Sequence, residues 1–142
     1  MGYPRLRTTP ERSRLMSRVR QEGTAPELLL RALLRRKAVR FRSNRKGLPG
    51  SPDIVVPRER HALFVHGCFW HRHRGCAACT TPKSNAAFWA EKFRANRARD
   101  RQNLRELKAL GYTVMTIWEC QLRSRTKRAR LERRILRFLG EG

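Results

Sequence analysis

The sequence predicts one α/β domain in which helices flank a mixed β-sheet. Its 142 residues are the size of a single ordinary domain. Short apolar or β-branched runs and longer helical patterns follow one another in the order helix, three strands, helix, strand, helix, with no internal repeat. We therefore expect one domain over residues 24–142, preceded by a separate segment over residues 1–23.

The first helix is predicted to begin at Thr24-Ala-Pro-Glu27 and to run to about Ala38. This segment has the form of a capping box, in which Thr24 is the N-cap and Glu27 reaches back to it. We expect the helix to direct apolar side chains toward a core, namely Leu28, Leu29, Ala32 and Leu33.

Three strands and a turn-rich loop are predicted next, and a fourth strand lies near the end of the chain. Glycine and proline are concentrated in Gly47–Pro52, which reads as a loop that ends at Asp53. The predicted strands are an edge strand at Val39–Arg42, adjacent buried strands at Ile54–Val56 and Ala62–Val65, and a β-branched and aromatic strand at Tyr112–Trp118. The helices that complete the domain are a long one over Pro82–Gly111 and a basic amphipathic one over residues 126–139.

Two polar residues interrupt an otherwise apolar stripe on the long helix. The stripe consists of Trp89, Phe93, Asn96, Asp100, Leu104 and Leu107, at spacings of three and four residues. One interpretation is that Asn96 and Asp100 form buried hydrogen bonds or lie on the solvated margin of the stripe. The other is that this part of the helix borders a functional site. The sequence favours neither.

The net charge is the strongest property of the composition. Lys and Arg number 34 against 11 Asp and Glu, which gives a formal charge of +23. Such an excess destabilises a compact chain by self-repulsion and is typical of proteins that bind a polyanion. The alternative is that codon bias in a GC-rich genome inflates the arginine count. We expect nucleic acid as the partner, and we interpret the basic residues 1–23 as an arm whose order depends on DNA.

The composition also indicates in which cellular compartment the protein is expected. No apolar run approaches the roughly 20 residues of a membrane-spanning helix. The Arg-rich N-terminus lacks the apolar region of a secretory signal. We therefore expect a cytoplasmic protein, which in a bacterium lies with the nucleoid.

A carboxylate at the start of a buried strand is a candidate ligand for a divalent cation. Asp53 follows Ser51-Pro52 and precedes Ile54–Val56. Mg²⁺ prefers oxygen ligands and is usually held by one or two carboxylates together with water and substrate phosphate. A Pro-Asp pair is by itself more typical of a turn that enters a strand. The following strand strengthens the metal interpretation, because it leads to His66 and His71.

A second metal pattern follows in the cysteine- and histidine-rich segment. Tetrahedral Zn²⁺ takes four Cys or His ligands, commonly at short local spacings with one distant partner. Cys68, His73, Cys76 and Cys120 satisfy this requirement, and Cys79 in place of His73 is a competing choice. A closed site of this composition would be structural. The alternative is a set of unrelated free thiols.

Two adjacent aromatic residues, Phe69 and Trp70, lie inside the same segment. Large rings on a rigid basic loop can wedge between base pairs. The alternative is that one of them packs beneath the loop.

The chain resembles the very short patch repair (Vsr) DNA mismatch endonuclease family over nearly its whole length, from about Thr9 to Leu139. The segments that carry the resemblance are Leu48–Asp53, Phe64–His71, Phe88–Lys92 and Ile117–Cys120. The resemblance implies a restriction-endonuclease-like fold of the PD-(D/E)xK type. It also implies an enzyme that nicks DNA 5′ to the thymine of a T:G mismatch arising from deamination of 5-methylcytosine.

The resemblance assigns roles to particular residues. Asp53 and the main-chain carbonyl of Val65 correspond to the Mg²⁺ site, His71 to the histidine that activates water, and His66 to a second active-site histidine. Glu27 corresponds to an acidic residue that hydrogen-bonds into the centre, a role that competes with helix capping. The remaining assignments are structural zinc at Cys68, His73, Cys76 and Cys120, and DNA contacts at Met16, Phe69, Trp70 and Trp89. Besides these, we expect Lys92 and Asn96 of the long helix to contact DNA.

Three departures from the family pattern bear on these roles. Val65 stands where some members have Thr, which leaves a main-chain carbonyl unchanged. Gly75 adds a residue to the zinc loop, and Cys79 is an additional thiol. Two rivals to the expected function are a non-catalytic, zinc-stapled DNA-binding module and a nicking nuclease for another mismatch or lesion. We expect a monomer whose nick is processed by downstream mismatch-repair proteins.

Overall fold

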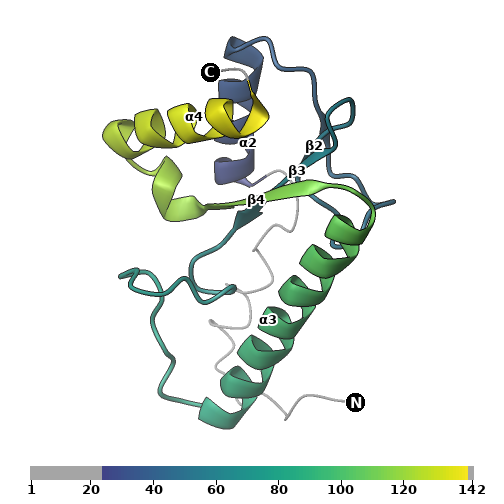
Figure 1. Cartoon of the computed structure of the whole chain (residues 1–142). Helices are drawn as coiled ribbons and strands as arrows, with labels where there is room; N and C mark the ends of the chain where they lie inside the picture. The colour runs from purple at the N-terminus through teal and green to yellow at the C-terminus, as the bar shows by residue number, and fades with distance from the viewer. Residues whose placement is uncertain (1–23, 141–142) are drawn as a thin grey trace.

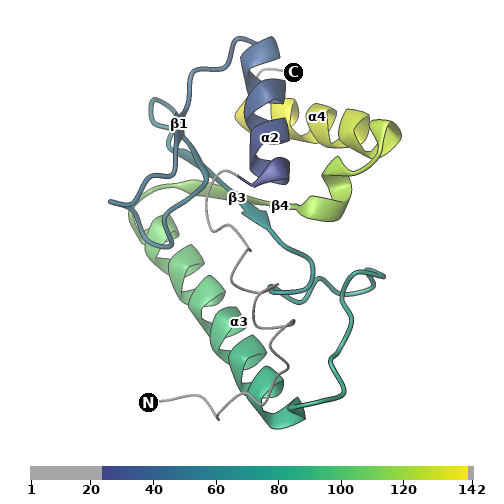
Figure 2. The same cartoon turned by 180° about the vertical axis from the view of Figure 1, so that it is seen from behind.

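The computed structural model describes residues 24–140, which form a four-stranded mixed sheet with helices on both faces (Figures 1 and 2). The sheet order is β1-β2-β3-β4; β1, β2 and β3 pair antiparallel, whereas β3 and β4 pair parallel. In chain order the elements are α2 (Ala25–Arg36), β1 (Arg42–Ser43), β2 (Ile54–Val56), β3 (His61–His66), α3 (Ala86–Ala109), β4 (Thr113–Trp118), the 3-10 turn η1 (Glu119–Leu122) and α4 (Arg125–Leu139). The predicted order of elements is therefore confirmed. None of the helices described is long and apolar enough to span a membrane.

The main core lies between the sheet and the pair of helices α2 and α4. It is formed by Leu30, Leu33, Leu34, Ile54, Val56, Leu63, Ile117, Leu122, Leu131, Ile135 and Leu139. Helix α3 lies on the other side of the sheet and makes the connection from β3 to the parallel strand β4; its C-terminal end is near β4, and its N-terminal end extends away from the sheet (Figure 1). The C-terminal end of β3 therefore lies near α3, and the loop that follows β3 begins there.

The predicted core face of the first helix was mostly wrong. Of the four side chains expected in the core, only Leu33 is buried, while Leu28 and Leu29 are 50% and 43% exposed. Leu30 and Leu34 occupy the inner face in their place, and Glu27 shares that face. The error arose because the helical pattern was assigned to apolar residues alone, whereas one inward position is taken by a carboxylate.

Two element boundaries also differ from the prediction. The edge strand begins at Arg42 rather than Val39, because Ala38 adopts a left-handed conformation (φ 56°) and Val39 donates a hydrogen bond back to Leu34. The long helix begins at Ala86 rather than Pro82, after a left-handed Asn85. It ends as predicted before Gly111, whose φ of 87° suits glycine.

Candidate active site

Asp53 lies where β2 begins and faces the end of β3. Its Oδ2 accepts a hydrogen bond of 2.7 Å from the main-chain amide of Val65. In an extended strand the N–H and C=O of one residue point to the same side. The Val65 carbonyl therefore faces the Asp53 side of the strand, so the two oxygen donors predicted for Mg²⁺ are on the same side of β3.

The loop before Asp53 packs closely against α3. Gly50 has a φ of 74°, and a Cβ at this position would lie 2.7 Å from the side-chain nitrogen of Asn103. Only glycine meets both conditions without displacing Asn103. The close approach holds the loop, and with it Asp53, against the helix that carries Asp100.

Glu27 contributes a second carboxylate from the first turn of α2. It is 5% exposed, and its Oε2 lies 3.4 Å from the guanidinium of Arg31. Thr24 accepts a hydrogen bond from the amide of Glu27, as the capping pattern predicts. The Glu27 side chain also lies close enough to Asp53 to raise the pKa of that carboxyl. Its position therefore brings it into the predicted catalytic centre.

The environment of Asp53 favours its protonated form. Burial raises the pKa of this carboxyl from 3.8 to about 7, the charge and hydrogen bond of Glu27 add to the rise, and the Val65 amide and Arg31 oppose it. Two neighbouring carboxylates that are largely removed from water require a compensating positive charge. A divalent cation would supply that charge.

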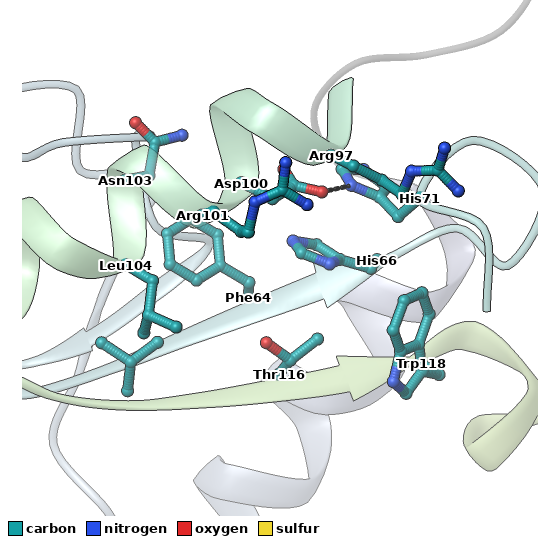
Figure 3. Close-up of a pocket in the computed structure, with 11 residues that line it drawn as sticks. Phe64, His66, His71, Arg97, Asp100, Arg101, Asn103, Leu104, Thr116 and Trp118 are labelled. Carbon is teal, nitrogen blue, oxygen red and sulfur yellow. Dashed lines mark hydrogen bonds and ion pairs between the residues drawn. The ribbon is translucent and has the colours of Figure 1, made fainter. Parts of the chain in front are cut away.

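The two predicted histidines lie at the end of β3 and in the following turn. Their imidazole rings stack, with centroids 3.8 Å apart and an angle of 8° between the planes. The Nδ1 of His71 lies 2.7 Å from Oδ2 of Asp100 on α3. Figure 3 shows this contact, with His66 beneath His71 and above β4. A carboxylate accepts only, so Nδ1 donates, and Nε2 of a neutral His71 is left as a proton acceptor.

His66 is held in the neutral state. Burial lowers its pKa from 6.5 to about 4, and the neighbouring His71 adds to the decrease, whereas Asp100 opposes it. A neutral imidazole can donate one hydrogen bond and accept another without repelling a protonated His71. Ligand atoms of His66, His71 and Asp100 lie within 4.8 Å of one another. However, parallel stacked rings direct their lone pairs alongside each other rather than toward one point, which favours proton transfer over metal binding.

The carboxylates and the histidines open into one cavity of about 570 Å³. Its lining comes from α2, the loop before β2, the end of β3 with the turn after it, and α3. The residues are Glu27, Asn44, Gly50, Ser51, Asp53, Phe64, Val65, His66, His71, Asn96, Arg99, Asp100 and Asn103. A second hollow of about 270 Å³ lies along the other side of the histidines, between α3 and β4, and Arg97 and Arg101 line it (Figure 3). His66 and His71 thus form a wall shared by both.

The predicted zinc ligands converge into a single cluster. One ligand atom from each of Cys68, His73, Cys76 and Cys120 lies within 4.8 Å of the others. Three thiols and one imidazole at this separation fit the tetrahedral donor set of a structural zinc site. Cys79 is not in the cluster, which favours His73 over the competing choice. Gly75, the additional residue of this loop, adopts a left-handed turn (φ 73°) with open space around it.

An aromatic cluster joins the zinc loop to the first half of α3. Trp89 and Phe93 are 2% and 5% exposed, and the Phe69 ring contacts both edge-on. Trp70 is half-buried and contacts Phe69 and Trp89. Phe69 and Trp70 thus form the outer layer over two buried rings. Trp89 lies beneath them in this structure and would reach DNA only if the cluster opened.

Polar groups fix the outer layer in place. Lys92 Nζ lies 5.1 Å from the centre of the Trp70 ring, and the side-chain amide of Asn96 donates to the Trp70 carbonyl. The Arg72 guanidinium lies 4.1 Å from the centre of the Phe93 ring and donates to Thr80 and Thr81 across the loop. We call Phe69 and Trp70, together with the buried rings of Trp89 and Phe93, the aromatic platform. Lys92 and Asn96, which were expected to contact DNA, therefore lie beside this platform. Met16, the remaining expected contact, is outside the described residues.

Comparison with known proteins gives the family. A family model described as DNA mismatch endonuclease Vsr matches residues 6–78. The chain is 50% identical to the type II nicking enzyme V.XorIIP of Xanthomonas oryzae over 117 residues, which are 82% of this chain and 85% of the relative. The chain belongs to the Vsr family. It is therefore a DNA endonuclease that nicks its substrate.

Other members of the Vsr family are similar over the same region. The DNA mismatch endonuclease Vsr of Escherichia coli is 41% identical over 116 residues, which cover 82% of this chain and 74% of that protein. The type II nicking enzyme V.NmeAIP of Neisseria meningitidis is 41% identical over 118 residues, or 83% and 84% of the two chains. The first name describes a DNA mismatch endonuclease and the second a nicking enzyme, so only the first names a mismatch as the substrate.

Three residues of this Vsr-family chain belong to the site without having been assigned to it from the sequence. Asp100 orients His71, and its only signal was the polar break in the apolar stripe of α3. Trp118 stacks on His73 at 4.2 Å and contacts His66 edge-on at 5.5 Å, so it links the zinc cluster to the histidines. Arg72 had no signal, because its partners are the Phe93 ring of α3 and main-chain and hydroxyl groups of its own loop, none of which sequence spacing reveals.

Proposed function

We propose that this enzyme nicks DNA at a T:G mismatch, on the 5′ side of the thymine, and so begins very short patch repair. The observation that carries the catalytic part is that Asp53 and the hydrogen-bonded pair His71–Asp100 line the same cavity. We further place the sheet in the restriction-endonuclease-like class, since Asp53 begins the central antiparallel pair β2–β3. The mismatch specificity rests on the family resemblance and on the aromatic platform.

The donor sets fit the two proposed metals. Asp53 and the Val65 carbonyl would hold Mg²⁺, with Glu27 as the neighbouring carboxylate. Burial and the neighbouring Glu27 raise the pKa of Asp53, so a cation bound there would offset the cost of its negative charge. Bound there, Mg²⁺ supplies charge neutralisation to the scissile phosphate and the leaving 3′ oxygen. The cluster of Cys68, His73, Cys76 and Cys120 would hold structural zinc.

His71 is the proposed general base. Asp100 holds its Nδ1 proton and so leaves Nε2 to accept a proton from the attacking water. His66, neutral at cellular pH, stacks against His71 and would give one hydrogen bond to the phosphate. Attack at phosphorus breaks the bond to the 3′ oxygen, which leaves a 5′ phosphate and a 3′ hydroxyl.

The aromatic platform is proposed to provide recognition. Phe69 and Trp70 rest on buried rings, so they present a rigid edge that can enter the base stack. A T:G wobble pair stacks less well than a matched pair, so it is opened at lower cost. We expect the enzyme to act as a monomer and downstream repair proteins to process the nick.

A strand-resolved nicking assay tests this function. Duplexes with a T:G pair, each other mismatch and a matched pair are labelled on one strand or the other and incubated with Mg²⁺. We expect cleavage of the thymine strand of the T:G duplex, and its loss in Asp53→Ala with binding retained. Tight binding without any cut would indicate the non-catalytic module, whereas preference for another mismatch would indicate the other rival.

A further inference from the structure

Helix α4 carries a row of arginines on the face that points away from the core. Its inner face consists of Leu131, Ile135 and Leu139, each buried. On the opposite side, Arg130, Arg133, Arg134 and Arg137 follow one another at spacings of three, one and three residues, which place them on one helical face. All four are exposed. We call this set the α4 arginine row.

The α4 arginine row has no counter-charge in the part of the chain that the structure describes. The acidic residue of α4, Glu132, lies to the side, where it pairs with Lys37 at 3.0 Å and Arg36 at 3.7 Å of α2. None of the four arginines forms an ion pair or a hydrogen bond with a described residue. Like charges three and four residues apart destabilise a helix, and the row contains four such pairs.

The first turn of α4 adds a second unfavourable feature. It contains Arg125 and Lys127 and no acidic residue. Positive charge near a helix N-terminus opposes the helix dipole. Both features destabilise α4 in isolation, and both would be relieved by a polyanion along its outer face.

The catalytic cavity does not include this face. The cavity is lined by residues of α2, the loop before β2, β3 with the turn after it, and α3, and no described residue of α4 contributes to it. In both views α4 lies beside α2 on one side of the sheet, whereas α3 lies on the other (Figures 1 and 2). The persistence length of duplex DNA is about 150 base pairs, so bending one duplex around the protein from the cavity to the α4 row would cost elastic energy.

We propose that the α4 arginine row binds the phosphates of a second DNA duplex while the first occupies the catalytic cavity. Arg130 and Arg137 are seven positions apart, which corresponds to about 10 Å of helix, or about three phosphates of one DNA strand. Charge complementarity without base contacts suits binding that is independent of sequence. This inference rests on the proposed function, because it requires that the cavity hold a duplex. The second site would let the enzyme pass between DNA segments without first entering solution.

Competitor-dependent dissociation tests the proposal. A short fluorescent T:G duplex is bound to the full-length enzyme and then challenged with increasing amounts of an unlabelled matched duplex. Direct transfer through a doubly bound complex makes the dissociation rate rise with competitor concentration. We expect this rise for the native enzyme and a flat response for R130Q/R133Q/R134Q/R137Q. The salt slope of binding to the second, matched duplex should fall by about 3.

Matched variants distinguish an effect of the positive charge of the row from an effect on folding. The quadruple Arg→Lys variant keeps the positive charge and should retain the rise. R133Q/R134Q should weaken the rise of the dissociation rate with competitor concentration. R58Q/R60Q, which removes two charges from the β2–β3 turn, should leave this rise unchanged. Single-turnover nicking of the short duplex should be the same in all of them.

Three outcomes would overturn the proposal. The first is a flat response of the native enzyme, and the second is a rise that persists in the glutamine variant. The third is a loss of affinity confined to long duplexes without competitor dependence, which would assign the row to flanking DNA of the same molecule. Failure of the proposed function looks different, since the native enzyme would then transfer between duplexes yet nick no mismatch.

Discussion

Replacing Asp53 with asparagine should stabilise the enzyme in the absence of Mg²⁺ while abolishing nicking. The carboxyl is largely buried beside Glu27, and its pKa rises from 3.8 to about 7 on folding. Its charged form is therefore disfavoured in the folded state at neutral pH. Asparagine keeps a carbonyl oxygen that can accept the hydrogen bond from the Val65 amide. It removes only the charge.

The shift in the pKa sets an upper limit for the gain. Three units at about 1.4 kcal/mol each correspond to roughly 4 kcal/mol in the free energy of unfolding above pH 7. Partial solvent exposure and structural relaxation reduce this limit, so we expect about 2 kcal/mol. For a chain of this size that is a rise in Tm of about 6–10 °C.

The gain should depend on pH in one direction. Because the folded pKa of Asp53 is raised, its contribution to stability is complete below the unfolded pKa and is lost as pH rises toward about 7. The advantage of asparagine is therefore at its full size at pH 8 and about half as large at pH 5.5. Added Mg²⁺ should raise the Tm of the native enzyme and leave that of the variant unchanged.

Thermal unfolding by circular dichroism measures these effects, in buffer free of Mg²⁺ and of chelators that would remove zinc. The matched control is Glu59→Gln, which removes an exposed carboxylate from the β2–β3 turn and should change Tm little. The reasoning is refuted if the asparagine variant is no more stable at pH 8, or if its advantage is equal at both pH values. Retained nicking would refute the catalytic assignment.

Three further predictions concern the rest of the site. Asp100→Ala should slow single-turnover nicking by roughly 100-fold or more with DNA affinity retained, because Nδ1 of His71 loses its acceptor; a rate within a few-fold of native would contradict the base assignment. Cys120→Ser should release zinc, measured by metal content, and reduce both binding and nicking, whereas Cys79→Ser should be silent; the reverse pattern would exchange their roles. Trp70→Ala should lower the preference for a T:G duplex over a matched one by about 10-fold in equilibrium binding, and an unchanged ratio would remove this ring from recognition.

The order of the elements was predictable from the sequence because strand and helix periods are local properties. The errors occur where contacts between distant parts of the chain, rather than local periodicity, decide the position of a residue. The first helix was assigned an inner face of apolar residues alone, yet Glu27 occupies that face, and its carboxylate lies beside Asp53. Likewise, the start of α3 depends on the backbone of Asn85, which no periodicity reveals.

The components of the site were predictable to different degrees. Cys68 and Cys120 could be paired with the other zinc ligands because ligand chemistry restricts the choice to a few residue types. Asp100 could only be marked as an interruption, since its role depends on meeting His71 across 29 positions of sequence. The stacking of His66 on His71 could not be inferred, because it depends on the turn after β3 rather than on spacing.

Trp118 gives a physical reason why a structural zinc site should affect catalysis. One face of its indole stacks on His73, a member of the zinc cluster, and its ring meets His66 at 76°. His66 in turn stacks on His71, whose Nδ1 is bound to Asp100. Each contact in this series holds a ring in one orientation, and interiors packed in this way transmit small displacements. Loss of the proposed zinc would free His73 and remove the support beneath Trp118, so His71, the proposed proton acceptor, would lose its alignment although zinc takes no part in the proposed chemistry.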